Sequence, residues 1–532
     1  MDDERLYTAR PVAAHAKLGV QQAQTKESLT LETTPAIFIP RPRRELRVRD
    51  LPDALVIQDP TTGQSIHLGR ESSAIWIALA AGHDTPTTLC MAVPHLDPPL
   101  IRVRLKQLRE GLLLDDDLWQ RTAPVFHVPA PRVDPLPLHL APELRHRCVG
   151  CGGSCTGVEI GPVPKATLAA IEAHRLFEGT PDTTSATDCV VDRPYGIQPA
   201  QFMKRADGRC VMLNGENQCA VHRAAGPGAK PGVCQQFPYT FTRGRDAIYV
   251  SLQMECRSLA ASLEQGAALD HEKLLSELRV HSEGPIVNVL PDPIRLAPGV
   301  YVTQAEYLAW WSKRTDAPLD QWAADAIDWT EAVGTGEAPE WLSEAHWGET
   351  ATVEPAALRA ALYQQIGMAT ALVSQEAAKE GRLVEQEQAD LVRKAALVAA
   401  KHVPLSRTHW ADEGAPVLFD RAVRAAAAGH DFVQDCDLLY GLGRLRLGQS
   451  LARALSRLRA VQVGRVSVTP QDVNDALVVT NIVLRMPYME QMLKMGEAAV
   501  RAFAAPARSY APWMGVPHPA LLESSSTHGG AS

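Results

Sequence analysis

The sequence predicts an α+β protein of several domains: a small domain of strands and helices, a loop-rich cysteine domain and a large, mostly α-helical C-terminal region. Three observations support this division. Residues 35–117 combine short alternating or β-branched runs with helical spacing, residues 145–260 hold eight of the ten cysteines, and residues 261–518 are rich in Ala and Leu at helical spacing. A chain of 532 residues is long enough to bury several cores.

The ends of the chain and its charge exclude several classes of protein. Residues 1–34 are polar and aperiodic and predict a flexible tail, and residues 519–532, rich in Ser and Gly, predict a disordered one. No signal segment opens the sequence and no apolar run is long enough to cross a membrane, so we expect a cytoplasmic protein with no membrane partner. The net charge of −8 gives no general attraction to nucleic acid, and no such partner is expected.

Strands come before helices in the first domain. The runs E-L-R-V-R, A-L-V-I-Q-D and S-I-H-L have the alternation or β-branching of strands, and the turn Asp59–Gly63 joins the second run to the third as a hairpin. Helical spacing follows from Arg70, from Thr87 and from Pro98. This order of short strands and three helices is that of a small winged-helix domain.

A basic run opens the same domain. R-P-R-R-E-L-R-V-R, from Arg41 to Arg49, carries five arginines. The favoured interpretation is a solvated edge strand whose charges prevent aggregation. An anion site or an acidic-peptide site is the alternative.

More closely, residues 35–117 resemble the PqqD-like domain, the recognition element for ribosomally made, modified peptides. The resemblance rests on the basic strand after a proline, the hairpin ending in S-I-H-L-G, the helix S-S-A-I-W-I-A-L-A-A-G and the last helix ending in L-R-E-G-L-L. In that family the sheet edge and the third helix bind an extended leader peptide as an added strand. The resemblance implies a set of peptide contacts here: Leu46, Arg47, Val48, Arg49, Arg102 and Leu105. A winged-helix packing module without a ligand is the alternative.

A proline-rich stretch follows at residues 118–144. It carries six prolines between Pro124 and Pro142. We expect a semi-rigid linker that forms no helix and separates the first domain from the cysteine domain.

The cysteines of residues 145–260 are spaced like metal ligands. The candidate ligands are Cys148, Cys151, Cys155, Cys189, Cys210, Cys219, His222, Cys234 and Cys256. Thiolates two or three residues apart reach one metal centre through a tight turn, which Gly150 and Gly152 permit. Thiols in the cytoplasm are kept reduced, which favours metal over disulfides, and metal binding supplies stability that a loop-rich segment lacks. Cys90 and Cys436 lie apart and are predicted to be small buried hydrophobes.

The spacing leaves the metal open. Zinc takes four ligands per ion, so eight cysteines suffice for two ions, and C-x-x-H suits zinc. A [4Fe–4S] cluster takes four thiolates, and three sulfurs within C-x-x-C-x-x-x-C suit such a cubane. Ligand softness does not separate an iron–sulfur cluster from zinc, so both stay open on the residues alone. His222 is a ligand, a hydrogen-bond donor to a thiolate or a packed side chain, and Lys230 neutralises cluster charge or is merely exposed.

The cysteine domain is similar to the zinc- or iron-chelating CxxCxxCC (YkgJ-type) family, which includes bacterial flagellin lysine-N-methylases. The matching segments are H-R-C-V-G-C-G-G-S-C, G-R-C-V-M-L, Q-C-A-V-H, K-P-G-V-C-Q-Q-F-P-Y and V-S-L-Q-M-E-C. The chain departs from that pattern in having one cysteine where the family often has a pair, and in an insertion between His222 and Pro231. The resemblance implies an iron–sulfur cluster and S-adenosylmethionine as donor, although the sequence carries no standard motif for that donor.

Helices are predicted through most of residues 261–518. Thr303 and Glu306 have the spacing of a capping box. The recurrent tryptophans are assigned to core packing: Trp310, Trp311, Trp322, Trp329 and Trp341. The glycines of G-L-G at 441–443 do not complete a nucleotide-binding motif.

Two functions remain open from the sequence. The first is a metalloprotein that modifies a peptide or protein: the PqqD-like domain captures the substrate, and the helical region completes a pocket for a lysine-type side chain beside the cluster. Lysine N-methylation is the reaction that the family resemblance implies. The second is a non-catalytic metal-binding or redox-sensing protein that uses the winged-helix module as a partner adaptor.

Overall fold

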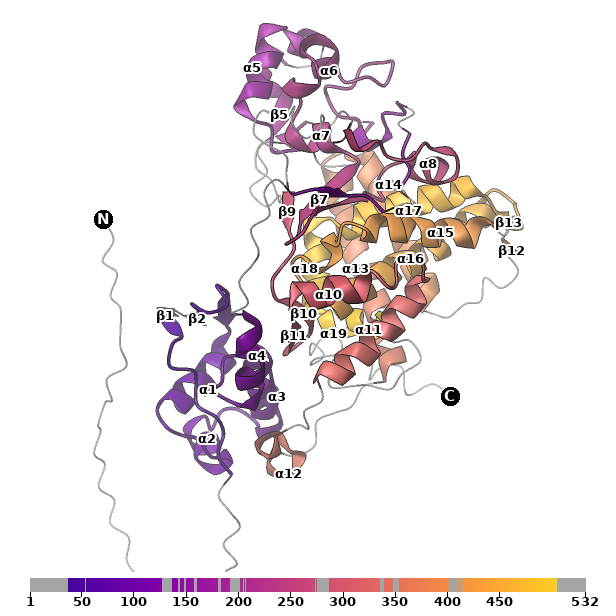
Figure 1. The fold of residues 1–532 in the computed structure, drawn as a ribbon. Coiled ribbons are helices and arrows are strands. Elements are labelled where there is room, and N and C mark those ends of the chain that lie inside the picture. The colour runs from indigo at the N-terminus through magenta and orange to yellow at the C-terminus, as the bar shows by residue number, and fades with distance from the viewer. Residues whose placement is uncertain are drawn as a thin grey trace, which may run out of the picture. The chain divides into compact units, whose positions relative to one another are not determined.

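The structure of the protein is a computed structural model (Figure 1). It describes residues 37–504 except for the following: 53, 127–135, 142–143, 148–149, 157–159, 180–182, 192–200, 204, 206, 273, 275–286, 335–338, 348–353, 401–408 and 411–413. The chain forms helices and small sheets, which confirms the predicted mixed class. It divides into two compact units, here called the first unit (Met1–Val128 with Val333–Thr352) and the second unit (Pro129–Ala332 with Val353–Ser532). The tails expected at 1–34 and 519–532 lie outside the described residues.

A three-stranded antiparallel sheet opens the first unit. Its strands are β1 (Arg47–Leu51), β2 (Ala54–Gln58) and β3 (Ser65–Leu68), in the order β1-β2-β3. The predicted turn joins β2 to β3: Asp59 Oδ1 accepts a hydrogen bond from the Thr61 amide at 2.9 Å, and Gly63 has a φ of +70°. A side chain rarely adopts that left-handed conformation, so the glycine serves the hairpin.

Three helices complete the core of this unit. They are α1 (Arg70–Ala80), α2 (Pro86–Ala92) and α3 (Pro98–Glu110). Their apolar faces bury Ile75, Leu89 and Ile101 against Ile57 of β2. Burying large aliphatic side chains supplies most of the stability of a small domain.

A segment from far along the chain completes that core. Trp341, Leu342 and Trp347, from η5 (Glu340–Leu342) and α12 (Glu344–Trp347), belong to the same cluster of buried side chains. Arg102 Nε donates to the Leu342 carbonyl at 2.7 Å. The sequence assigns this segment to the C-terminal helical region, but three large apolar side chains in a short segment do not reveal which core they enter.

A fourth helix corrects the predicted linker. α4 (Asp117–Phe126) covers the start of the stretch in which no helix was expected, and Pro124 lies inside it. Asp116 Oδ1 accepts from the Trp119 amide at 3.0 Å, and Trp119 is 7 % exposed beneath the Arg43 guanidinium, 3.3 Å from its ring centroid. A proline near the end of the helix removes one backbone hydrogen bond. The N-terminal cap and the burial of a large aromatic ring offset this loss of stability.

The second unit is built around a bundle of helices: α13 (Pro355–Lys379), α14 (Leu383–Ala400), α15 (Gly414–Ala427), α16 (Leu438–Gln462), α17 (Pro470–Leu484), α18 (Pro487–Met495) and α19 (Glu497–Ala504). α16 packs against α14, α17 and α19 (Figure 1). Gly443 lies against the Val500 backbone and Gly441 against that of Phe432, with no room for a Cβ. G-L-G is therefore a site of close packing. No helix among the described residues has the length and apolar character needed to cross a bilayer.

Strands and an aromatic cluster pack against this bundle. One sheet has the order β4-β8-β7-β9, from β4 (Leu138–His139), β7 (Tyr239–Arg243), β8 (Ile248–Leu252) and β9 (Val287–Val289). The remaining elements of this part are β10 (Ile294–Ala297), β11 (Val300–Val302), α10 (Gln304–Trp311), α11 (Leu319–Gly334), β12 (His409–Trp410) and β13 (Ser467–Val468). The capping box predicted for Thr303 and Glu306 begins α10. Trp310, Trp311 and Trp322 are buried in the core, as predicted.

A buried ion pair gives the first unit a testable pH dependence. Arg43 donates to Asp59 at 2.8 Å, and both side chains are buried. Burial opposes ionisation of Asp59, but hydrogen bonds from Arg43 and the Thr61 amide outweigh it and hold the pKa of Asp59 below its usual value. A carboxylate with a depressed folded-state pKa stabilises the fold above its unfolded pKa of about 4, and this contribution disappears as the pH falls through the folded pKa.

We therefore expect Asp59→Asn to lower the stability of the hairpin at neutral pH by up to about 3 kcal/mol, because Arg43 loses its buried carboxylate and keeps only Glu45 and the Leu112 carbonyl, and to remove the acid-dependent loss below about pH 4. Hydrogen–deuterium exchange of residues 54–68, corrected for intrinsic rates, measures this. Asp50→Asn, at an exposed position of β1, is the matched control. An unchanged pH profile in Asp59→Asn would contradict the assignment.

Candidate functional site

The cysteine segment has short elements joined by loops. They are η1 (Gly153–Cys155), α5 (Lys165–Ala173), η2 (Leu176–Gly179), η3 (Ala186–Cys189), β5 (Val190–Val191), β6 (Gln201–Phe202), α6 (Ala220–Ala225), η4 (Pro227–Ala229), α7 (Gly232–Gln236) and α8 (Leu259–Gln265). A small apolar core that includes Ile171, Phe202 and Val221 holds most of them together. Short helices and two-residue strands bury little surface, so side-chain contacts at the cysteines matter for this segment.

The first cysteine motif forms the predicted tight turn. Gly150 and Gly152 have φ values of +62° and +63°, in the left-handed region that glycine adopts without strain. The Gly153 amide lies 3.4 Å from Cys151 Sγ, which accepts its hydrogen bond. Cys151 is exposed, and Cys148 lies outside the described residues.

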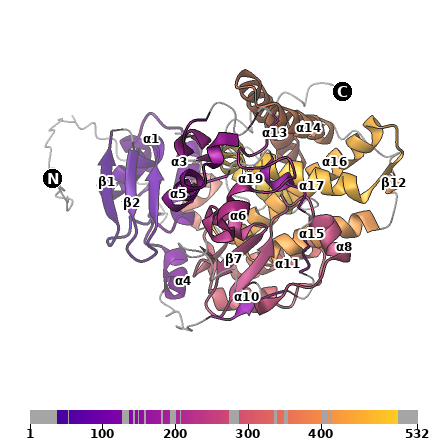
Figure 2. The same ribbon diagram turned by 90° about the horizontal axis from the view of Figure 1, so that it is seen from above.

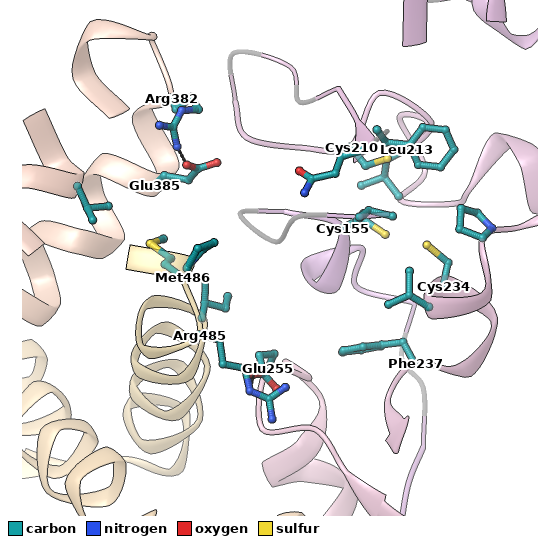
Figure 3. A pocket seen from close by; sticks show the side chains of 18 of the residues that line it. Cys155, Cys210, Leu213, Cys234, Phe237, Glu255, Arg382, Glu385, Arg485 and Met486 are labelled. Atoms are coloured by element: carbon teal, nitrogen blue, oxygen red, sulfur yellow. Dashed lines mark ion pairs between the residues drawn. The ribbon is translucent and has the colours of Figure 1, made fainter. Parts of the chain in front are cut away.

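Four cysteines from four segments line one cavity: Cys155, Cys210, Cys219 and Cys234. The Cys210 amide donates to the Cys155 carbonyl at 2.7 Å, which joins the first motif to the second. Figure 3 shows the sulfur atoms of Cys155, Cys210 and Cys234 turned toward one another. Burial raises the pKa of the Cys234 thiol, and the other three cysteines raise it further, against the opposing effect of Lys230.

The remaining candidate ligands lie elsewhere. Cys189 is fully buried in the apolar core of the segment, where burial and then Asp188 raise its pKa. Cys256 Sγ is 3.7 Å from His146 Nε2 and 3.2 Å from Ser258 Oγ. His222, on α6, is not among the residues that line the cavity, and burial and Lys230 lower its pKa.

The two isolated cysteines pack as predicted. Cys90 lies against the core of the first unit, and Cys436 lies against that of the second. Cys436 Sγ is 3.0 Å from the Phe432 carbonyl, and burial raises the pKa of its thiol to about 12. Both residues are half-buried rather than fully buried, and each packs as a small hydrophobe against its core.

The chemistry of the four-thiol wall fits a soft metal. Among the described residues, no three His, Cys, Asp or Glu side chains are placed closely enough to hold one ion together. The four thiols nevertheless converge, and the cost of burying thiolates is what raises the pKa of Cys234. A cation at this wall would remove that cost by displacing protons, and thiolates are the ligands that zinc and iron–sulfur clusters prefer.

Helices of the bundle supply the opposite wall. The cavity has a volume of about 760 Å³, and Leu372 of α13, Glu385 of α14, Ile482 of α17 and Tyr488 of α18 line it. Figure 3 shows these helices facing the cysteine segment. A close approach sets the distance between the walls: a Cβ on Gly208 would lie 2.7 Å from that of Val384. Pockets of this size hold small ligands or single side chains.

Ion pairs join several charged side chains of the helical wall. Arg382 pairs with Glu385, and also with Glu380 at 2.6 Å. Lys379 pairs with Glu376 at 3.5 Å. Each of these pairs lies within a few positions along the chain, so the local sequence alone brings the charges together. Their contribution to the cavity was not predicted from the sequence.

A further ion pair joins segments far apart in the sequence. Glu255, which directly precedes Cys256, is 5 % exposed and lies 3.0 Å from Arg485 Nε. Asp431 lies 3.9 Å from the same guanidinium. The Glu255 carboxylate raises the pKa of Arg485, while burial and Glu255 raise the pKa of Asp431 against the effect of Arg485. In the sequence, Glu255 stood out only as the residue before the last cysteine, in the motif M-E-C.

The predicted peptide-binding residues fall into two groups. β1 is an edge strand whose five residues are all exposed, including Arg47, Val48 and Arg49 (Figure 2). Leu46 is half-buried against the core.

The helix positions correct the prediction. Leu105 is fully buried in the core, so its side chain is not available to a peptide. Arg102 donates to the Leu342 carbonyl, which uses its guanidinium in a contact with η5. Within the basic run, Arg43 is buried and Arg41 pairs with Asp84 at 2.8 Å, so these two are not free charges on an edge. The physical reason is that α3 turns its apolar face inward, toward the segment at 340–347.

Searches against protein-family models, curated proteins and solved structures find no match to this chain. A function can therefore be inferred only from the geometry of the cavity, the exposed edge of β1 and the motifs of the sequence.

Proposed function

We propose that this chain is a metal-cluster protein that modifies a peptide or protein substrate. The observation that carries the proposal is the convergence of four thiols, from four separate segments, on one wall of a cavity. Thiols brought together in this way suit a soft metal. The opposite wall supplies charged and apolar groups of the kind that position a substrate.

The proposed ligand set begins with Cys155, Cys210, Cys219 and Cys234. An iron–sulfur cluster of the [4Fe–4S] type is the favoured occupant, and zinc is the alternative, since both accept four thiolates. When bound, such a cluster would supply electron transfer beside the cavity, since four thiolate ligands leave no open position on its irons. The other candidate cysteines, with Cys256 beside His146, would serve a second centre or the fold. Reduced thiols of this number make the cytoplasm the proposed compartment.

The proposed reaction is N-methylation of a lysine side chain, with S-adenosylmethionine as donor. Its support is the resemblance of the cysteine motifs to flagellin lysine-N-methylases. The cavity adds a second support, because its apolar lining and charged groups suit a long side chain that ends in a charge.

Substrate capture is assigned to the first unit, through the edge of β1. The strand order, with β1 outermost and its side chains exposed, leaves one row of backbone groups for an added strand. This agrees with the resemblance to PqqD-like domains. The contact surface is revised to Leu46–Arg49, without Leu105.

A redox-sensing protein without catalytic activity is the second candidate. The exposed Cys151, in a glycine turn beside buried thiols, favours it, because accessible thiols are the ones that oxidants reach. Turnover of a peptide substrate separates the two functions.

The identity of the metal is the first test of the proposal. Protein purified without oxygen should be brown, with broad visible absorption from thiolate-to-iron charge transfer, and should contain iron and acid-labile sulfide. Colourless protein with stoichiometric zinc would replace the cluster by zinc. Protein that binds neither metal would overturn the metal centre.

The cavity thiols can be compared with a buried thiol elsewhere. Cys234→Ser should lose most of the bound metal, because a hydroxyl is a poor ligand for a soft metal. Cys436→Ser is the matched control: its thiol is also buried, with a raised pKa, but lies against the helical core. Metal and sulfide assays on both variants measure the effect. Equal losses would show that the cavity wall is not the metal site.

Peptide capture can be tested with proline on the β1 edge. Neighbouring residues of an edge strand point their N–H groups in opposite directions. Val48 and Arg49 are neighbours, so a proline at one of them removes a hydrogen bond to β2, and a proline at the other removes a donor from the free edge. The variant that keeps its fold should lose binding of candidate leader peptides encoded beside the gene, measured by fluorescence anisotropy. Wild-type affinity should be micromolar, about −8 kcal/mol.

Val48→Thr keeps every backbone donor and serves as the control for this experiment. Metal content should not change in any of these variants. Undiminished binding in a folded proline variant would favour the packing-module interpretation of the first unit.

A further inference from the structure

One carboxylate in the cavity lacks the hydrogen bonds that a buried charge requires. Glu255 is 5 % exposed, and neither of its Oε atoms accepts a hydrogen bond from any described residue. Its side chain lines the cavity, in the turn that follows β8. Glu255 has an ion-pair partner in Arg485, but its two oxygens keep acceptor capacity that a buried carboxylate normally uses.

Arg485 does not meet this need. Its Nε lies 3.0 Å from Glu255 Oε1, yet the pair does not have the alignment of a hydrogen bond, and the same guanidinium lies 3.9 Å from Asp431. Two carboxylates thus share one cation. The nearby Arg444 pairs with Glu490 at 3.1 Å. Negative charge and acceptor capacity are therefore in excess at this end of the cavity.

The other carboxylates that line the cavity are paired. Glu385 has Arg382, and Glu376 has Lys379. Lys230, which also lines the cavity, lowers the pKa of Cys234 and so acts on the wall of thiols. Among the described residues of the lining, the unmet acceptor is that of Glu255.

The surroundings of Glu255 restrict what its partner can be. Phe237, Ile482 and Met486 line the same cavity, and Figure 3 shows Phe237, Met486 and Arg485 around Glu255. An apolar surface that ends in a carboxylate matches an apolar stem that ends in a hydrogen-bond donor of positive charge. A neutral group of the same shape would leave the carboxylate bare.

We propose that Glu255 binds the positively charged nitrogen of a primary amine carried on an apolar stem, and so selects the side chain that enters the cavity. This inference rests on the proposed function, because it takes the amine to belong to the polypeptide substrate. Glu255 is a binding residue in this assignment, with Asp431 and Arg485 setting the charge around it.

The test uses the full-length protein and two small probes. One is N-acetyl-lysine methylamide, and the other is its norleucine analogue, which keeps the stem and lacks the amine. Saturation-transfer NMR titrations give the dissociation constant of each. We expect wild-type protein to bind the lysine probe about tenfold or more tightly than the norleucine probe, and Glu255→Gln to remove that difference, since one charge-assisted hydrogen bond is worth at least that factor.

Glu490→Gln is the matched control. It makes the same change of charge close by, at a residue that pairs with Arg444 and is not among those lining the cavity. It should keep the selectivity for the lysine probe. Selectivity that survives in Glu255→Gln, or that disappears equally in Glu490→Gln, would overturn the proposal.

Two further measurements keep the outcomes distinct. Circular dichroism shows whether Glu255→Gln is folded. If this variant is unfolded, equal binding of both probes by the wild-type protein overturns the inference. Tenfold selectivity of the wild-type protein, together with weaker binding of the lysine probe by Glu255→Asp, supports it. Metal content is determined on the same samples. If the protein binds no metal but still selects the amine, the proposed metal centre is wrong and the role of Glu255 stands. If the protein is loaded with metal but shows no selectivity, only the role of Glu255 is wrong.

Discussion

The second unit depends on one buried carboxylate, Asp437. It begins α16 by accepting a hydrogen bond from the Tyr440 amide at 2.8 Å, and it receives Arg501 of α19 at 2.6 Å and Arg295 of β10 at 3.4 Å. Burial alone would raise the pKa of Asp437, but the two guanidinium groups outweigh it and keep the carboxylate ionised. Removing Arg501 or Asp437 would break the closest buried ion pair of this core, which is among the costliest changes a fold can suffer.

The cavity inherits its geometry from that core. α16 packs on α14 and α17, and these helices carry one wall of the cavity, with Arg485 directly after α17. Two asparagines of α17 then tie this helix to the segment of the last cysteine. Asn474 Nδ2 donates to the Arg257 carbonyl at 2.7 Å, and Asn481 Nδ2 to Met254 Sδ at 3.7 Å. These contacts hold the segment on both sides of Glu255 against α17.

Local patterns in the sequence were enough to predict local structure. The Asp59–Gly63 turn and the Thr303 capping box follow from interactions within a few residues, and both are found. The failures involve partners far apart in the chain. Prolines between 118 and 144 hide α4, because the burial of Trp119 against Arg43 is not visible locally.

The candidate site divides in the same way. The clustering of cysteines predicted a thiol-lined site, and the glycine turn around Cys151 follows from local sequence, but the convergence of Cys155, Cys210, Cys219 and Cys234 depends on contacts between segments that lie apart in the chain. The helical wall could not be predicted, since the pairing of Glu255 with Arg485 joins positions 230 residues apart. Leu105 was misassigned because an amphipathic pattern marks the buried face of a helix without showing which residues stay accessible. The cavity also holds two groups with different chemical needs: thiols of the cysteine segment favour a metal cation, and the Glu255 carboxylate, although ion-paired with Arg485, has no aligned hydrogen-bond donor. Under the proposed function a metal and an amine would each remove one of these costs, so both ligands would stabilise the same cavity.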